Sequence, residues 1–199
     1  SEERAFPRIL QDRLHTGHVS TIIRNLVLDT KIKEPSNFSK LQQRLVNDFD
    51  FHLDDNVNFD EQTDLFVKAH YEDIIDKKRI LFDFNSSGSG FMQILQILVP
   101  IYLYCPKESR IVLLDEPDAH LHPNLQTALA KSLREIQKEL NIQIIISTHS
   151  TSIIRASDPS EVIPISSIEK NNRPLTSEYD VEQQISNRID TYELGKSVL

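Results

Sequence analysis

The sequence predicts an α/β protein: a mostly parallel sheet flanked by helices, with a helical and antiparallel portion on its N-terminal side. Two apolar runs, 110–115 and 142–147, are typical of strands, and the first is typical of a strand buried on both faces. Between them, residues 123–140 carry apolar side chains at helical spacing. Strand, helix and strand within about 35 residues predict a βαβ unit with a right-handed connection.

The composition narrows the class of protein. A chain of 199 residues is long enough for one domain with a core. The net charge of -8 gives no support to non-specific binding of nucleic acid, although a local basic patch stays open. A single cysteine, Cys105, excludes a disulfide framework and favours the reducing cytoplasm. The longest apolar stretch, 91–104, falls short of the roughly 20 residues of a membrane span, so we expect no membrane association.

Helices and antiparallel strands are predicted before residue 85. A first helix covers 19–30 and ends before Pro35, and a second follows Ser36. The second helix is expected to bury one face: Phe38, Leu41, Leu45, Val46 and Phe49. Alternating residues predict two antiparallel strands, 55–60 and 64–73, around a turn near Asp60, and 77–84 is typical of a third strand.

The parallel part is predicted to begin with a buried helix at 89–104. The helix at 123–140 is expected to bury one stripe: Leu125, Ala128, Leu129, Leu133, Ile136 and Leu140. The run at 161–166 is a candidate for one more strand, and a short helix is expected near 180–190 in a polar tail. We therefore divide the chain into an N-terminal portion (1–84), a core (85–168) and a polar linker (169–199).

Two acidic residues, Asp115 and Glu116, stand where the first parallel strand leaves the sheet. An acid at such a position can hold Mg²⁺ through its water shell, since this ion keeps several waters and takes few carboxylates. The next side chain points the other way and can polarise an attacking water. We assign Asp115 to magnesium and Glu116 to the general base. The alternative is an acidic helix cap, because carboxylates also favour the N-terminal helix dipole.

The segment NSSGSG, 85–90, is a serine- and glycine-rich turn that opens the apolar helix. Free backbone N–H groups, serine hydroxyls and the positive end of a helix form an anion site suited to a γ-phosphate. Serine and glycine also cap ordinary helices, so this segment by itself does not decide between the two interpretations.

Histidines lie close to both strand ends. His149, in STHS (147–150), follows the second strand and could hydrogen-bond a γ-phosphate, although a lone histidine is more commonly a loop residue. Asp118, His120 and His122 alternate in DAHLHP, but no cysteine, further histidine or acid lies at zinc-site spacing, so zinc is disfavoured. Because ligands bind beyond the carboxyl ends of parallel strands, we expect both segments at one site.

A phosphate-binding P-loop, GxxxxGK[ST], is not found in the sequence. The pattern needs two glycines five positions apart before the lysine. The chain has four glycines, and no two have this spacing: Gly17, Gly88, Gly90 and Gly195. The tripeptide GKS at 195–197 has Asp190 at the position of the first glycine and no strand-like run before it, so we treat it as a chance match.

The order of these motifs resembles one family. A serine–glycine turn, helix, acidic strand end, polar turn, helix, strand and histidine follow one another within 85–150. This series resembles the C-terminal half of an ABC-type ATPase head, with NSSGSG as a degenerate signature motif, RIVLLDEP as Walker B, DAHLHP as D-loop and STHS as switch-histidine loop. The phrasing is most similar to the OLD-type (overcoming-lysogenization-defect) branch, which includes ATPases of bacterial anti-phage systems such as Septu and retrons.

The resemblance implies binding and hydrolysis of ATP with Mg²⁺, and a head-to-tail pairing with a second copy of the head. It assigns roles to six residues: catalysis to Glu116 and His149, the metal to Asp115, and the nucleotide to Ser86, Gly88 and Asp118. The signature and Walker B motifs of one chain would then serve two different ATP molecules. In such heads the P-loop lies well upstream, so we expect this chain to begin after it and to be inactive alone.

Partners and alternatives follow from the same resemblance. An effector nuclease or toxin is the expected protein partner, anti-phage defence the expected role, and DNA binding stays open. One alternative is a clamp that binds DNA or a nuclease with negligible turnover. Another is the ATPase part of a TOPRIM nuclease. A TOPRIM domain needs an isolated glutamate and a later DxD on a fresh α/β unit, and neither is visible in this sequence.

Overall fold

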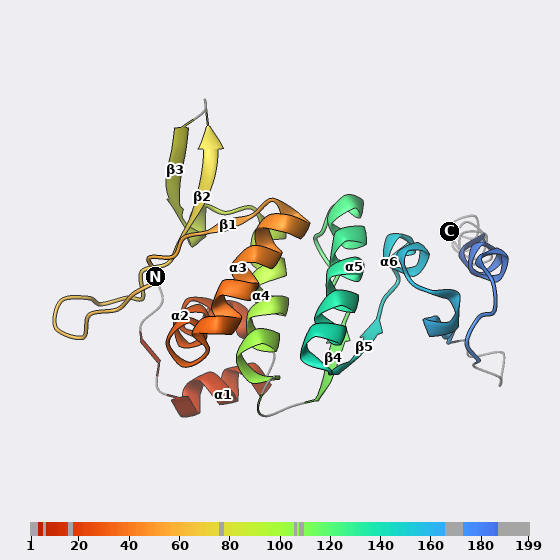
Figure 1. Ribbon diagram of the computed structural model, residues 1–199, viewed down its shortest axis with the longest axis horizontal. Coiled ribbons are helices and arrows are strands. Elements are labelled where there is room, and N and C mark those ends of the chain that lie inside the picture. Colours follow the sequence, from red (N-terminus) through yellow and green to blue (C-terminus); the bar gives the residue numbers. More distant parts are fainter. Residues whose placement is uncertain are drawn as a thin grey trace, which may run out of the picture.

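The computed structural model describes residues 4–5, 7–15, 18–75, 78–105, 107, 110–165 and 173–186. Helices α2, α3, α4 and α5 form the body, a β-hairpin projects from it, and strands β4 and β5 lie behind α5 in the view of Figure 1. In chain order the elements are α1 (Pro7–His15), η1 (Val19–Thr21), α2 (Ile23–Lys33), α3 (Pro35–Phe49), β1 (His52–Leu53), β2 (His70–Ile75), β3 (Lys78–Asp83), η2 (Phe84–Ser86), α4 (Ser89–Tyr104), β4 (Ile111–Asp115), α5 (Pro123–Leu140), β5 (Gln143–Ser147), α6 (Thr151–Ala156) and η3 (Pro159–Glu161).

Helix α3 forms because its sequence has suitable residues at both ends and an apolar stripe along one face. Pro35 takes the first helical position, where its fixed φ suits the helix, and Asp50 ends the helix with a left-handed φ of 57°. The predicted buried face is confirmed for four of its members: Phe38, Leu41, Leu45 and Phe49. Val46 is 37% exposed, because it lies one position past Leu45 and therefore at the edge of the stripe.

Helix α4 occupies the centre of the core, as its apolar sequence predicts. Ile94, Leu95 and Leu98 are fully buried, and the helix packs against α2 and α3 (Figure 1). Its bounds agree with the predicted range 89–104. No helix in the parts of the chain that the structure describes is both long and apolar enough to cross a membrane.

The antiparallel sheet has the strand order β1–β2–β3, with β2 and β3 paired over their whole length. The predicted strand at 77–84 is confirmed as β3, and the C-terminal part of the strand predicted at 64–73 is confirmed as β2. The strand predicted at 55–60 is wrong: it is reduced to one isolated antiparallel bridge between Asn58 and Lys68. Short polar side chains bind the local backbone there, since Asp54 accepts from the N–H of Asn56. Such local bonds compete with a strand ladder.

The βαβ unit is confirmed: β4 and β5 are parallel, in a register that pairs Ile111 with Gln143 and Asp115 with Ser147. Helix α5 joins them. Its N-terminus is capped by His122, whose ring nitrogen accepts from the N–H of Asn124, and its C-terminus ends at Asn141 with a left-handed φ of 50°.

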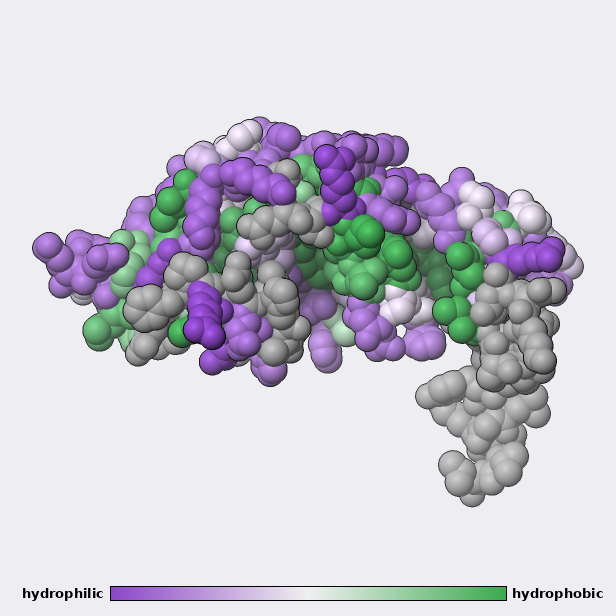
Figure 2. All heavy atoms as spheres, turned by 90° about the horizontal axis from the view of Figure 1, so that it is seen from below, coloured by the Kyte–Doolittle hydropathy of each residue, from purple (hydrophilic) through white to green (hydrophobic). Residues whose placement is uncertain are grey.

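The prediction that β4 is buried on both faces is wrong. One face of the two-stranded sheet packs against the core, whereas Ile111, Leu113 and Ile145 on the other face are 56%, 73% and 51% exposed. Figure 2, which views the molecule from below, shows hydrophobic residues gathered near the middle of the molecule. The physical reason is that the described chain supplies a layer for only one side of these strands.

The chain after α6 departs from the expected extra strand. Residues 162–165 are irregular after η3, and residue 166 lies outside the described residues. A helix spans 178–186, close to the range expected for one, and its Val181 and Ile185 are buried. An ion pair joins Arg155 of α6 to Glu182 at 2.7 Å. The tripeptide at 195–197 lies outside the described residues.

Candidate functional site

The carboxyl ends of β4 and β5 bring the two predicted motifs together. Asp115 and Ser147 are register partners, and the hydroxyl of Ser147 donates to the carboxylate of Asp115. The backbone N–H of Glu116 donates to the carbonyl oxygen of Ser147 at 2.9 Å. The expectation that the acidic strand end and STHS meet at one edge of the sheet is therefore confirmed, although the side chains of Asp115 and Glu116 lie exposed at that edge.

Glu116 has a left-handed backbone, with a φ of 44°. For a residue other than glycine this conformation costs about 1–3 kcal/mol and is found preferentially at functional sites. The carboxylate of Glu116 lies 3.7 Å from Nε2 of His149, and the two side chains are 59% and 80% exposed. The strained turn therefore places the predicted base beside the predicted switch histidine, with both open to a ligand.

Asp118 belongs to a second network behind this pair. Its carboxylate accepts from the hydroxyl of Thr148 at 2.5 Å, and that hydroxyl in turn accepts from the N–H of Ser150. Ser150 donates to Gln126 of α5 at 2.8 Å, and Gln126 donates to the carbonyl oxygen of Leu121 at 2.9 Å. These contacts fix the loop after β4 against the loop after β5.

Sequence reasoning missed the hydroxyl side chains in this network. Ser147 and Thr148 directly precede the predicted histidine in STHS, and each donates to one of two aspartates, Asp115 and Asp118, at or after the end of β4. A signal was present, since serine and threonine at the end of a buried strand can bind acids at the end of its neighbour. Gln126 gave no such signal, because nothing in the helical pattern of α5 distinguishes it from an exposed glutamine.

Asp115 and Ser147 could together hold a hard cation. A carboxylate and a hydroxyl are oxygen donors, and Mg²⁺ takes one or two carboxylates together with waters and phosphates. Among the residues that the structure describes, no group of three or more His, Cys, Asp or Glu side chains could hold a metal ion. One carboxylate and one hydroxyl leave the rest of such a shell to waters and phosphate oxygens. His122 is used otherwise, as the cap of α5.

The serine–glycine turn is shaped as an open helix N-terminus. The 3₁₀ turn η2 leads to Gly88, which begins α4 without any side-chain cap, so the first N–H groups of the helix stay available. Ser86 and Gly88 are exposed. A Cβ added to Gly88 would meet nothing within 4 Å in the described structure, whereas one added to Gly90 would lie 3.0 Å from Leu125. Packing against Leu125 therefore accounts for Gly90, whereas the space at Gly88 is open in the described structure.

The turn and the acidic strand end belong to one folded unit but form no common site. The side chain of Gln93, in the second turn of α4, donates to the carbonyl oxygen of Pro117 at 3.4 Å. Among the described contacts, none joins Ser86 or Gly88 to Asp115, Glu116 or His149. The structure thus brings Asp115, Glu116, Asp118 and His149 together at the ends of β4 and β5. Ser86 and Gly88 lie apart from them.

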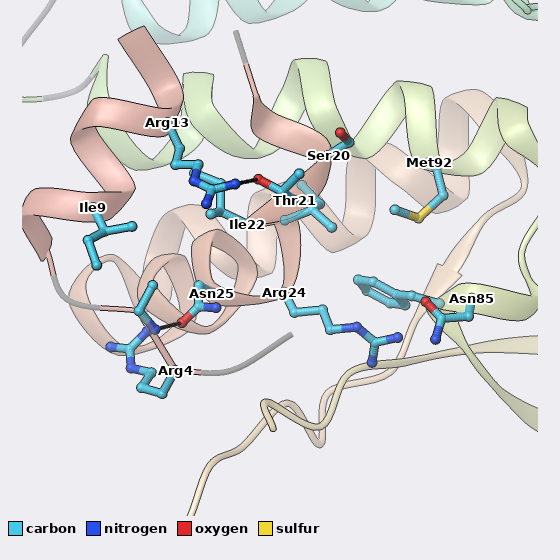
Figure 3. A pocket seen from close by; sticks show the side chains of 13 residues that line it. Arg4, Ile9, Arg13, Ser20, Thr21, Ile22, Arg24, Asn25, Asn85 and Met92 are labelled. Carbon is cyan, nitrogen blue, oxygen red and sulfur yellow. Dashed lines mark hydrogen bonds between the residues drawn. The ribbon is translucent and has the colours of Figure 1, made fainter. Parts of the chain in front are cut away.

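A cavity of about 580 Å³ lies beside the turn, away from the carboxylates. Arg4 and residues of α1, η1, α2, η2 and α4 line it, the latter including Arg13, Arg24 and Asn85 (Figure 3). None of the six predicted site residues is in its wall.

Comparisons with known proteins identify the family of this chain and one curated relative. The profile of the AAA ATPase domain family matches residues 3–154. The protein ea59 of Escherichia phage lambda is 26% identical over 126 residues, which make up 63% of this chain and 23% of that protein. The chain therefore spans about a quarter of the length of this curated relative.

Two solved structures are similar in shape. One, from work on ATP-driven dimerization and DNA-stimulated activation of SMC ATPases, has a TM-score of 0.57 at 14% identity and covers 80% of this chain and 94% of its own. The other, the SmcHead bound to the C-winged helix domain of ScpA, has a TM-score of 0.46 at 17% identity, with 70% and 44% covered. The first likeness shows that the α/β fold of this chain is that of an SMC ATPase structure.

Proposed function

Because this chain belongs to the AAA ATPase domain family, whose profile it matches over residues 3–154, we propose that it supplies the Walker B half of an ATP-hydrolysing site. The observation that carries the proposal is the meeting of Asp115, Glu116 and His149 at the ends of two parallel strands. Water attacks the γ-phosphorus, the bond to the β-phosphate oxygen breaks, and the carboxylate of Glu116 takes the proton of the water.

Asp115 and Ser147 are the residues we assign to Mg²⁺. When bound, this ion would neutralise charge on the phosphates of ATP. The hydroxyl of Ser147 donates to Asp115 and so holds the carboxylate in one orientation at the strand end. Asp118, held by Thr148, would keep the loop after β4 in place beside the nucleotide. His149, which is the more exposed member of its pair with Glu116, would hydrogen-bond the γ-phosphate.

We propose that a P-loop-bearing α/β unit completes this site by covering the exposed face of β4 and β5. Parallel sheets have both faces covered in almost all proteins, and here Leu113 and Ile145 are exposed on one face. The four glycines of the chain cannot form a P-loop, so the backbone cradle for the β-phosphate must come from other residues. The same polypeptide or a separate one could carry that unit.

Self-association in the presence of ATP is the role we propose for the serine–glycine turn. Exposed Ser86, the uncapped start of α4 and the open space at Gly88 together suit a phosphate that arrives from outside the chain. The nucleotide would be held by a second copy of the head, in head-to-tail order. ATP would then join two heads, and hydrolysis would release them.

A finer assignment rests on the phrases LLDEPDAHLHP and IISTHS. These favour the OLD-type branch, with a nuclease or toxin effector controlled by the ATPase in anti-phage defence. We place this activity in the cytoplasm, because a chain with a single cysteine is suited to a reducing compartment.

The test of hydrolysis is Glu116→Gln in a protein that contains both this chain and its P-loop unit. The amide cannot accept the proton of the water, so turnover should fall by about 10²- to 10⁴-fold while ATP binding is retained. Asp55→Asn, an exposed acid in the loop after β1, serves as the control. Wild-type turnover in the glutamine variant would refute the assignment of the base. Negligible turnover in the wild type, with intact ATP-dependent pairing, would favour the clamp.

The test of the turn is Ser86→Arg. A large cation at this exposed position blocks the close approach of a partner's phosphate, so light scattering with a non-hydrolysable ATP analogue should show no self-association. Nucleotide binding by the single head should stay unchanged, because the P-loop of that head is elsewhere. Undiminished self-association would refute the role of the turn in trans.

A further inference from the structure

Arg24 of α2 is a buried cation next to the serine–glycine turn. It is 5% exposed, and its two terminal nitrogens donate to the two carboxylate oxygens of Asp83, at 2.9 and 2.5 Å. Its guanidinium also lies 5.4 Å from the centre of the Phe84 ring. Such a two-pronged pair fixes distance and angle together, which a single ion contact does not.

Asp83 connects Arg24 to the backbone of the turn. It is the last residue of β3, and its Oδ1 accepts from the backbone N–H of Asn85 at 2.9 Å, which caps η2. The hydrogen bond from Arg24 holds the pKa of Asp83 below its ordinary value, so the carboxylate stays charged and keeps both partners. One carboxylate therefore connects helix α2 to the backbone directly before Ser86.

The far side of the turn is anchored by different contacts. The hydroxyl of Tyr71 donates to the carbonyl oxygen of Ser86 at 3.1 Å, and the hydroxyl of Ser87 donates to that of Phe84 at 2.7 Å. Phe84 is 2% exposed and packs edge-on against Phe91 of α4. These contacts fix the turn to the hairpin and to α4.

On the side of α1 and η1 the turn is not backed by packed side chains. The cavity of about 580 Å³ separates Asn85 and Met92 from Arg13 and Thr21. In Figure 3 the side chain of Arg24 extends along this cavity toward Asn85. On this side, the Arg24–Asp83 pair is a direct polar connection between the turn and α2, beside the contact of Arg24 with the Phe84 ring.

We propose that Arg24 is a positioning residue for the serine–glycine turn: through Asp83 it holds the backbone at 84–86 so that Ser86 and the free N–H groups of α4 face the nucleotide of a second head. This inference rests on the role in trans proposed above for that turn. The proposed role of Arg24, which is 5% exposed, is to position the turn and not to contact the nucleotide.

The experiment uses the full protein and two isosteric Asp→Asn variants. Each variant changes an aspartate that forms an ion pair involving helix α2. Asp83→Asn keeps the oxygen that caps Asn85 but presents an amide to Arg24, whose hydrogen bonds it cannot accept in full. Asp29→Asn is the matched control, because Asp29 pairs with Arg4 at 2.6 Å and with Lys33 at 2.7 Å from the same helix α2, away from the turn. Arg24→Lys is a second, milder variant that cannot form the two-pronged contact.

Three quantities are measured for each variant: thermal stability, nucleotide affinity of the single head, and self-association with a non-hydrolysable ATP analogue. Asp83→Asn and Arg24→Lys should weaken self-association by about tenfold, which is about 1.4 kcal/mol and in the range of one hydrogen bond to a charged group. Nucleotide affinity should stay within about twofold, a change of less than 0.5 kcal/mol. Asp29→Asn should lose stability without losing self-association.

The remaining outcomes overturn the proposal in distinguishable ways. If self-association falls in proportion to thermal stability in all three variants, Arg24 has a general structural role only. If Ser86→Arg abolishes self-association and Asp83→Asn leaves it unchanged, the turn acts in trans but needs no positioning by Arg24. If Ser86→Arg also has no effect, the proposed role of the turn fails, and the role of Arg24 fails with it.

Discussion

Leu113 offers the sharpest test of the proposal that a P-loop unit covers the exposed face of β4. Its side chain is 73% exposed, while its neighbour Leu114 points to the opposite face and packs against the core. Leu113→Thr keeps a residue that favours strands but removes most of the apolar surface. We expect this change to leave the stability of the 199-residue chain nearly unaltered and to weaken its association with the P-loop unit.

The size of the effect follows from the exposed fraction. Burying a whole leucine side chain contributes about 1.5–3 kcal/mol, so the exposed 73% of Leu113 is worth about 1–2 kcal/mol once a second layer covers it. Threonine leaves most of that contribution unrealised and brings a hydroxyl that needs a partner. The dissociation constant for the P-loop unit should therefore rise by about 5- to 30-fold.

The assay is titration of the chain with its P-loop unit supplied as a separate polypeptide, together with thermal unfolding of each chain alone. Leu114→Thr is the control, and it should destabilise the chain alone, because Leu114 is already packed. The reasoning would be refuted if Leu113→Thr left the affinity unchanged, or if it destabilised the isolated chain as much as the control does.

Three further predictions can be tested on the same material. The chain alone should show no saturable ATPase activity in a phosphate-release assay, and adding the P-loop unit should restore it; activity of the chain alone that Glu116→Gln stops would contradict this. Gly88→Ala should not change the melting temperature, because its Cβ meets open space, but should weaken ATP-dependent self-association in light scattering. Glu139→Gln should lower stability by about 1–2 kcal/mol at pH 7, because Glu139 accepts from Lys40 and Arg44. Burial opposes the ionisation of Glu139, but the hydrogen bonds from Lys40 and Arg44 outweigh it and lower the pKa of the carboxyl group. The stability that Glu139 contributes is therefore fully present above pH 4.5, the ordinary pKa, and is lost as the pH falls through the lower pKa of the folded state. Denaturant titrations of wild type and variant should therefore converge in acid, and a difference that persists there would contradict this reading.

The sequence by itself determined the local elements that have strong patterns. Helix α4 and helix α5 have the predicted bounds, and β4 and β5 lie within one residue of theirs, since apolar periodicity, Pro123 and a left-handed Asn141 act over a few residues. The meeting of Asp115 with STHS was also predictable, because parallel strands joined by one helix bring their carboxyl ends to the same edge.

Only the tertiary structure decided which faces are covered and which polar groups pair. Four apolar residues at 111–114 are compatible with burial on both faces, but Leu113 is exposed, because burial depends on a layer that strand periodicity does not specify. The pairing of Arg24 with Asp83, 59 positions apart, could not be read from either residue. The hydrophobic pattern of a segment indicates which of its side chains can be buried. Which segments come into contact is decided by the fold alone.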